Sequence, residues 1–361
     1  PNAGSFGMAV STAMIFGLVS LMFLDTSINM AMQPFKMMVG DMVNEKQKGL
    51  AYSIQSFLCN AGSLVGFLFP FIFTWIGISN IAPQGVVPDS VIFSFYIGAA
   101  ILILCVIYTT VKVKEMPPAE YAEYHGITEE EEKEKINMVK LLVKAPKAFW
   151  TVGLVQFFCW FAFIFMWTYT NGSVAANVFD APTVETAVNG VSKVMLDTKS
   201  IQYQDAADWV GVLFAVQAIG SVLWAVCIPL FKDRKLIYSL SLVLGGLGFI
   251  STYFVHNQYV LFISFLLIGC AWAAMLALPF TILTNALSGG HMGTYLGLFN
   301  GTICIPQIVA ASLGGSILAL FTPKGMLPPE INMLVMAGVM LIIGAVCVYF
   351  IKETKGEQVK A

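Results

Sequence analysis

The chain has 361 residues, of which 58% are hydrophobic and only 11% are charged. Soluble proteins usually carry about 25% charged residues, so we expect much of the surface of this protein to face lipid. The net charge of −2 argues against a nucleic-acid partner, because phosphate binding needs a basic surface. The 7 cysteines lie inside apolar runs and are interpreted as small hydrophobic residues, not as disulfides or metal ligands.

Nine apolar stretches each reach the length of about 20 residues that a helix needs to cross a bilayer. They cover residues 7–39, 50–78, 90–113, 148–170, 207–231, 236–255, 258–286, 294–321 and 330–351. The sequence therefore predicts an all-α membrane protein with nine transmembrane helices.

The basic residues between these stretches predict the orientation. If the connection 40–49 is cytoplasmic and the sides alternate, most of the 19 Lys and Arg residues fall on the cytoplasmic side, and only Lys193, Lys199 and Lys324 fall outside. Cytoplasmic loops of membrane proteins carry an excess of such residues. We expect residues 1–113 to be the remainder of an N-terminal half and 148–352 to be a C-terminal half of six helices. The segment 114–147 is then a cytoplasmic linker, 171–206 an outside loop of unassigned role, and 353–361 a cytoplasmic tail.

Two segments suggest an internal duplication. Residues 34–49 and 279–293 both begin with Pro-Phe late in an apolar stretch and leave it through a short connection that ends near a glycine. Transporter halves are often related by such repeats. If spans one to three match spans seven to nine, three further helices precede residue 1, and the nine predicted here are the last nine of twelve.

Polar residues follow one face of the first predicted span. Asp25, Asn29, Gln33 and Lys36 fall within a helical sector of roughly 80°. A charge in mid-membrane costs at least ~2.5–3.5 kcal/mol, so these groups should face an interior or a cavity. Asp25 is the predicted proton-coupling acid, because desolvation favours the protonated form of a carboxyl group. The alternative is a buried structural acid.

Lys36 and Asp41 lie near the cytoplasmic end of the same span. They are candidates for a gate that opens and closes during transport. The alternative is an interfacial pair in which the lysine extends its charge to the membrane surface.

The fourth span carries Gln156, Trp160 and Trp167 on one face. Aromatic rings can stack on the apolar faces of a sugar while amides bind its hydroxyl groups, so this face is a candidate sugar site. Ordinary packing is the alternative for all three residues. Trp272 with Pro279 is interpreted either as a hinge or as core packing.

Further amides complete the predicted polar set, namely Gln55, Asn60, Gln217, Asn300 and Gln307. Each is a candidate substrate ligand, although a single intramembrane amide is more often a hydrogen bond between helices. No protease, hydrolase or phosphate-loop motif occurs, and the 3 histidines lie in or beside connections. We therefore expect no enzyme, no cofactor and no metal site.

These residues resemble a known family. The pattern Leu24-Asp25-xxx-Asn29-xxxx-Pro34-x-Lys36-xxxx-Asp41 is similar to the fourth helix of the sucrose/glycoside–cation symporters of the major facilitator superfamily. That family includes plant sucrose transporters and their animal and bacterial relatives. It usually has arginine where Lys36 stands, so the charge is kept here but the two-pronged donor is lost.

Other segments extend the resemblance over most of the chain. Gln156-Phe-Phe-Cys-Trp160 is similar to the seventh helix of the family, and Pro279-Phe280 with Gly297-Leu-Phe-Asn300-xxxxx-Pro306-Gln307 is similar to the tenth and eleventh. Lys232-Asp233-Arg234-Lys235 is similar to the connection from the eighth to the ninth helix, which adds Asp233 and Arg234 to the gating candidates.

The resemblance implies a major facilitator superfamily helix bundle that imports a disaccharide or related glycoside, such as sucrose or maltose, together with protons. Asp25 would carry the proton, and the neighbouring polar groups would bind the sugar. We expect a monomer in a bacterial inner membrane. Three alternatives remain open: a carrier of a drug or organic anion, a sodium-coupled carrier, and a receptor built on a transporter fold.

Overall fold

The computed structural model describes residues 12–44, 47–78, 89–114, 117, 120, 138–188, 191–287, 292–323 and 325–351. The chain forms two compact units, residues 1–48 and 49–361, and each is described by itself. The predicted linker 114–147 lies largely outside the described residues, and the tail 353–361 lies wholly outside them.

The first unit consists of one long helix, α1 (Thr12–Met42), which contains Pro34. At 1.5 Å per residue, a helix of 31 residues is long enough to cross a bilayer. The hydroxyl groups of Thr26 and Ser27 each donate to the carbonyl four residues earlier, at 2.7 Å. Polar side chains of an apolar helix thus find partners within the helix itself.

The second unit is built mainly from helices, which coincide with the remaining predicted stretches except for one short helix in the predicted linker 114–147. They are α2 (Lys48–Trp75), α3 (Asp89–Lys112), α6 (Met138–Lys144), α7 (Lys147–Asn177), α8 (Ile201–Cys227), α9 (Arg234–Ser251), α10 (Leu261–Ala286), α11 (Met292–Phe299), α12 (Gly301–Phe321) and α13 (Ile331–Val348). A short 3-10 turn, Ile228–Leu230, follows α8. The fold class predicted from the sequence is confirmed.

The number of spans needs a correction. In the part of the chain that the structure describes, eight helices are long and apolar enough to cross a membrane, whereas the sequence predicted nine spans. The difference is α2, which coincides with the predicted second span and is not among the eight. The side chains at positions 70, 71 and 74 of α2 lie outside the described ones, and in the described part of this helix Gln55, Ser56 and Asn60 lower the hydropathy.

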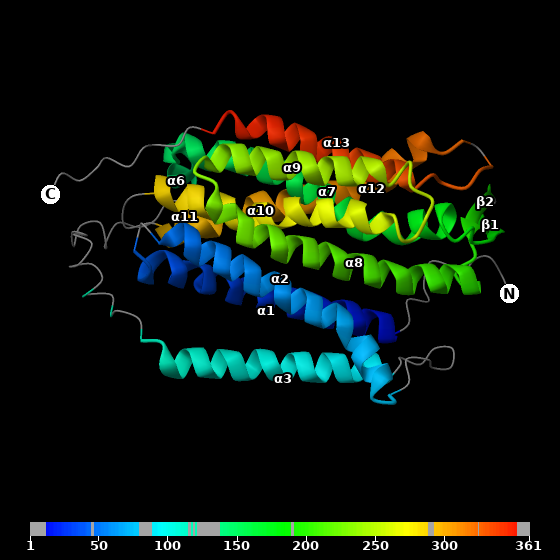
Figure 1. Ribbon diagram of the computed structural model, residues 1–361, viewed down its shortest axis with the longest axis horizontal. Helices are drawn as coiled ribbons and strands as arrows, with labels where there is room; N and C mark the ends of the chain where they lie inside the picture. Colours follow the sequence, from blue (N-terminus) through cyan, green and yellow to red (C-terminus); the bar gives the residue numbers. More distant parts are fainter. Residues whose placement is uncertain are drawn as a thin grey trace. The chain divides into compact units, whose positions relative to one another are not determined.

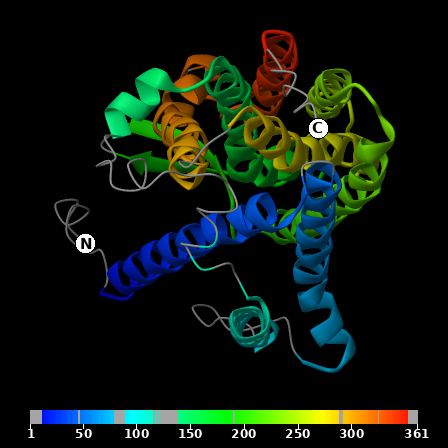
Figure 2. The ribbon, with the colours of Figure 1, turned by 90° about the vertical axis from the view of Figure 1, so that its left-hand side faces the viewer.

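Helices α7 to α13 form a bundle in which α7 packs on α12 and α13, and α10 packs on α8 and α9 (Figures 1 and 2). Glycines let two pairs of helices approach closely. A Cβ placed on Gly269 of α10 would lie 2.7 Å from the backbone nitrogen of Ser221 on α8. A Cβ on Gly246 of α9 would lie 2.9 Å from the carbonyl oxygen of Gly338 on α13. Small residues at such crossings are typical of membrane helix packing.

The connection between α7 and α8 contains a β-hairpin. Strands β1 (Thr183–Val188) and β2 (Val191–Leu196) pair antiparallel, with Thr183 opposite Leu196 and Val188 opposite Val191. Figure 1 places this hairpin at one end of the bundle and α6 and α11 at the other. We name these the hairpin end and the α6 end.

Candidate functional site

One turn of α10 receives polar side chains from two other helices. Ser56 of α2 donates from Oγ to the carbonyl of Ala273 at 3.4 Å. Gln156 of α7 donates from Nε2 to the carbonyl of Met275 at 3.0 Å. The structure therefore brings the predicted polar segments of α2 and α7 to the same turn, which we call the α10 turn (residues 272–275).

An aromatic cluster lies beside the α10 turn. The ring centroid of Trp272 is 5.8 Å from that of Trp160, 5.6 Å from that of Trp167 and 4.8 Å from that of Phe163. Trp167 is 44% exposed, so the cluster is open on one side. The sequence predicts Trp272 either at a hinge or in core packing and does not predict its position in this cluster. Tertiary packing decides that position, since no spacing relates Trp272 to α7.

Several buried polar atoms near these elements have no hydrogen-bond partner among the described residues. Five belong to the predicted substrate ligands: Gln55 Nε2, Asn60 Oδ1, Gln156 Oε1, Trp160 Nε1 and Asn300 Oδ1. Asn171 and Ser221 carry two more. A buried unsatisfied donor or acceptor costs about 1–3 kcal/mol. A ligand rich in hydroxyl groups, which both donate and accept, could supply the missing partners.

The remaining bonds of these side chains fix their orientation. Asn60 donates from Nδ2 to the carbonyl of Ser56 at 2.7 Å, which leaves its Oδ1 to accept from another group. Asn300 lies in the turn between α11 and α12, and its Nδ2 is 3.9 Å from Cys304 Sγ. The same turn passes near α7, because a Cβ on Gly153 would lie 2.9 Å from a methyl carbon of Thr302.

Aromatic rings pack between the helices towards the α6 end. Tyr52 of α2 stacks on Phe280 of α10 with centroids 6.3 Å apart, and Phe280 lies 5.9 Å from Phe299 of α11. Phe299 in turn lies 5.6 Å from Phe149 of α7. All four side chains are buried. This aromatic chain joins α2 to the bundle on the α6 side of the α10 turn.

Other predicted site residues lie elsewhere in the second unit. Gln217 is buried on α8, and Gln307 is half-buried on α12. Asp233 is exposed and caps α9, because its Oδ1 accepts from the backbone nitrogens of Lys235 and Leu236 at 3.0 Å. A helix cap is sufficient to explain this aspartate, and its gating role stays a prediction.

The predicted coupling residues belong to the first unit. Asp25 is exposed on α1, and Asn29 donates from Nδ2 to the carbonyl of Asp25 at 2.9 Å. Lys36 is half-buried, whereas the side chains of Gln33 and Asp41 lie outside the described ones. These residues share one helix, as predicted, and their roles stay predictions.

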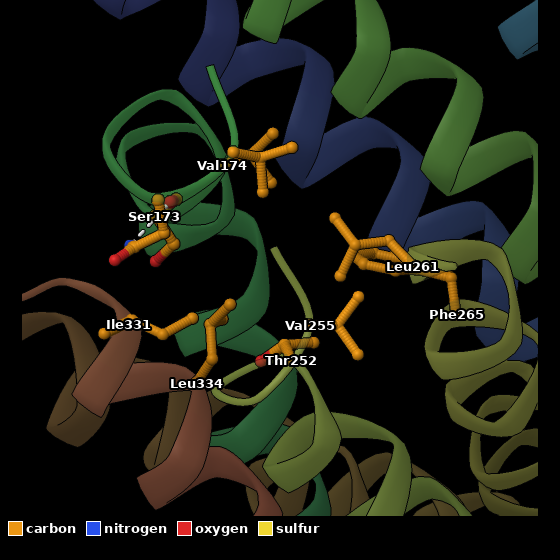
Figure 3. A pocket seen from close by; sticks show the side chains of 10 residues that line it. Ser173, Val174, Thr252, Val255, Leu261, Phe265, Ile331 and Leu334 are labelled. Carbon is orange, nitrogen blue, oxygen red and sulfur yellow. Dashed lines mark hydrogen bonds between the residues drawn. The ribbon is translucent and has the colours of Figure 1, made fainter. Parts of the chain in front are cut away.

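Two hollows of the second unit contain none of the predicted site residues. Ser173, Thr252, Leu261, Ile331 and other residues enclose a cavity of about 10 Å³ at the hairpin end, which has room for about one water molecule (Figure 3). A groove of about 540 Å³ lies between α9, α12 and α13 and is lined mainly by apolar side chains. The candidate site is therefore defined by the α10 turn and not by either hollow.

Comparisons with known proteins agree with this architecture. Among solved structures, the chain is similar to a single-site variant of the E. coli fucose:proton symporter FucP, with 15% sequence identity and a TM-score of 0.53. The match covers 88% of this chain and 72% of the symporter chain, and at this identity it establishes the fold alone. No curated protein sequence matches the chain. Residues 174–361 match the Major Facilitator Superfamily, and with more than half of its length matched, the chain belongs to that superfamily.

Proposed function

We propose that this protein is a proton-coupled sugar importer whose substrate is a disaccharide or related glycoside. Membership of the major facilitator superfamily and the fold shared with a fucose:proton symporter support a secondary transporter of a sugar or another small solute. The disaccharide class comes from the resemblance of the motifs on α1, α7, α10 and α12 to the sucrose/glycoside symporters.

The unsatisfied polar atoms beside the tryptophan cluster carry the proposal. Trp160 and Gln156 stand one turn apart on α7, and each has one buried polar atom without a partner among the described residues. A sugar ring would stack on an indole face and exchange hydrogen bonds with those atoms. A hydrophobic drug would leave them unsatisfied, and an organic anion would need a cation at the α10 turn, where the described side chains are apolar or neutral.

Asp25 is the proposed proton carrier. In an alternating-access cycle, an outside proton loads Asp25 and favours binding of the sugar, and the two are released together to the cytoplasm. Coupling of this kind is reciprocal, so the sugar must also raise the affinity for the proton. The proposed location is the inner membrane of a bacterium, and the proposed active form is a monomer.

Uptake by reconstituted protein tests the proposal. The protein would be placed in proteoliposomes with an inward proton gradient at low sodium, and uptake of labelled sucrose and maltose would be measured. We expect accumulation that a protonophore abolishes and that unlabelled glycosides inhibit. If accumulation required sodium instead of a proton gradient, the coupling ion would be sodium and not the proton. If no accumulation, exchange or competition were observed, the sugar assignment would be refuted, but the chain would still belong to the superfamily.

The variant Asp25→Asn tests the coupling step. It keeps the shape of the side chain but cannot take up a proton, so we expect downhill exchange to continue and uphill accumulation to stop. Asp205→Asn is the matched control, because Asp205 is exposed on α8 and has no proposed role. Normal accumulation by the Asp25→Asn variant would exclude Asp25 as the coupling acid.

A further inference from the structure

The start of α13 carries an acidic residue in an unusual position. Glu330 directly precedes the helix, where a carboxylate commonly accepts hydrogen bonds from free backbone N–H groups and is stabilised by the helix dipole. Its side chain makes no such bond. The carboxyl group of Glu330 therefore lacks the capping hydrogen bonds that would stabilise its ionised form.

The carboxyl group of Glu330 instead lies against α7. A Cβ placed on Gly172 would be 2.8 Å from Glu330 Oε1 and 2.5 Å from its Cδ. A side chain at this point of α7 would therefore require the carboxyl group of Glu330 to move. The neighbouring residues Ser173 and Ile331 line the water-sized cavity of Figure 3, so α7 and α13 lie side by side here.

The surroundings of this carboxyl group offer no compensating charge among the described residues. Tyr169, one turn before Gly172 on α7, is the titratable group that faces it, and a Cβ on Gly314 of α12 would lie 2.6 Å from the Tyr169 hydroxyl. Helix α12 has no charged residue, and the charged residues of α9, Arg234 and Lys235, lie at its opposite end. Lys324, in the loop before α13, lies outside the described residues.

We propose that Glu330 is a second proton-binding site of this protein, located where α13 meets Gly172 of α7 at the hairpin end and separate from Asp25. Glu330 is half-buried, and partial burial favours the neutral acid, because the carboxylate loses more hydration than the neutral group where it lies against α7. When the proton leaves, the carboxylate must move towards water, which loosens the contact between α13 and α7. With the predicted orientation, the proton comes from the outside.

The expected pH dependence of stability follows from the pKa of this group. Burial raises the pKa of Glu330 from its ordinary value of 4.5 to about 7. Between these values the folded protein binds more protons than the unfolded chain does. The free energy of unfolding therefore falls as the pH rises from about 4.5 to about 7, and the contribution levels off above that range.

Thermal unfolding in detergent tests the proposal without any sugar. We would measure the melting temperature from pH 4 to pH 8 for the unsubstituted protein, for Glu330→Gln and for the control Asp205→Asn. We expect the melting temperature of Asp205→Asn to fall between pH 4.5 and 7 as it does in the unsubstituted protein. In Glu330→Gln this fall in melting temperature should be smaller, because the titrating carboxyl group is gone. A difference between the unsubstituted protein and Glu330→Gln that stays constant across this range would refute the proposal.

Gly172→Ala provides a second variant that keeps the acid. The added methyl group would push the carboxyl group towards water and return its titration to the ordinary range. The melting temperature of this variant should therefore also fall less between pH 4.5 and 7. It keeps the proposal testable if Glu330→Gln does not fold. Both measurements are independent of transport, so failure of the sugar assignment and failure of this site are distinguishable.

Discussion

At the scale of single residues, Trp160 and Trp224 form a natural comparison. The indole nitrogen of Trp160 is buried without a partner among the described residues, whereas that of Trp224 donates to Ser241 Oγ at 2.8 Å. Replacing Trp160 with Phe removes an unsatisfied donor, so we expect the melting temperature of the empty protein to stay constant or rise. If the donor binds substrate, sugar affinity should fall about fivefold, which corresponds to the roughly 1 kcal/mol of one hydrogen bond.

The control substitution should behave in the opposite way. Trp224→Phe loses a satisfied hydrogen bond and should lower stability by about 0.5–1.5 kcal/mol with no effect on sugar affinity. Tryptophan fluorescence titrations and thermal unfolding on both variants would check this pair of outcomes. Equal affinities for Trp160→Phe and the unsubstituted protein would remove Trp160 from the proposed site.

At the scale of elements, the crossing of α8 and α10 depends on two glycines. A Cβ on Gly269 would lie 2.7 Å from the Ser221 nitrogen, and one on Gly220 would lie 2.9 Å from the Leu266 Cα. Backbone atoms cannot rotate away, so Gly269→Ala must force the helices apart and should cost about 1–3 kcal/mol of stability.

Gly315 of α12 is the matched control for this crossing. No heavy atom lies within 4 Å of a Cβ placed there, so Gly315→Ala should be neutral or should stabilise the helix by up to about 1 kcal/mol. Unfolding in detergent would compare the two variants. A Gly269→Ala variant as stable as Gly315→Ala would mean that the crossing is looser than the structure indicates.

The helices themselves were predictable from apolar runs, but their ends were not. The sequence placed the end of the fourth span at residue 170, whereas α7 continues to Asn177. Thr170 and Ser173 look like loop residues, yet each donates its hydroxyl hydrogen to a carbonyl four residues earlier and is buried. The hairpin had a signal that the sequence analysis did not use, because Asn-Gly at 189–190 is a favoured dipeptide between paired strands.

The site was predictable in part for a similar reason. Amides and tryptophans in apolar stretches stand out by composition alone, so Gln55, Gln156 and Trp160 could be selected as candidates, and their roles stay predictions. Their meeting on α10, and the position of Trp272 and Glu330, depend on which helices pack together. A single sequence holds no direct record of those contacts.

At the scale of the whole molecule, the orientation in the membrane decides what each end does. The excess of basic residues predicts that the α6 end is cytoplasmic and that the hairpin end faces outside. The orientation decides the side from which Glu330 would take its proton, since Glu330 lies at the hairpin end. The aromatic chain of Tyr52, Phe280, Phe299 and Phe149 would then separate the α10 turn from the cytoplasm.

Fusion reporters test this orientation in cells. We expect alkaline phosphatase inserted at Thr198, in the exposed turn after β2, to be active outside the cytoplasm, and a green fluorescent protein fused to the end of the chain to fluoresce inside. An inactive phosphatase in a fusion that still inserts into the membrane would show that the orientation is the opposite of the predicted one. Outside protons would then reach the aromatic chain first, and Glu330 would bind a cytoplasmic proton instead. The pH dependence of unfolding would be unchanged, because it depends on burial of the acid between α7 and α13 and not on the side of the membrane.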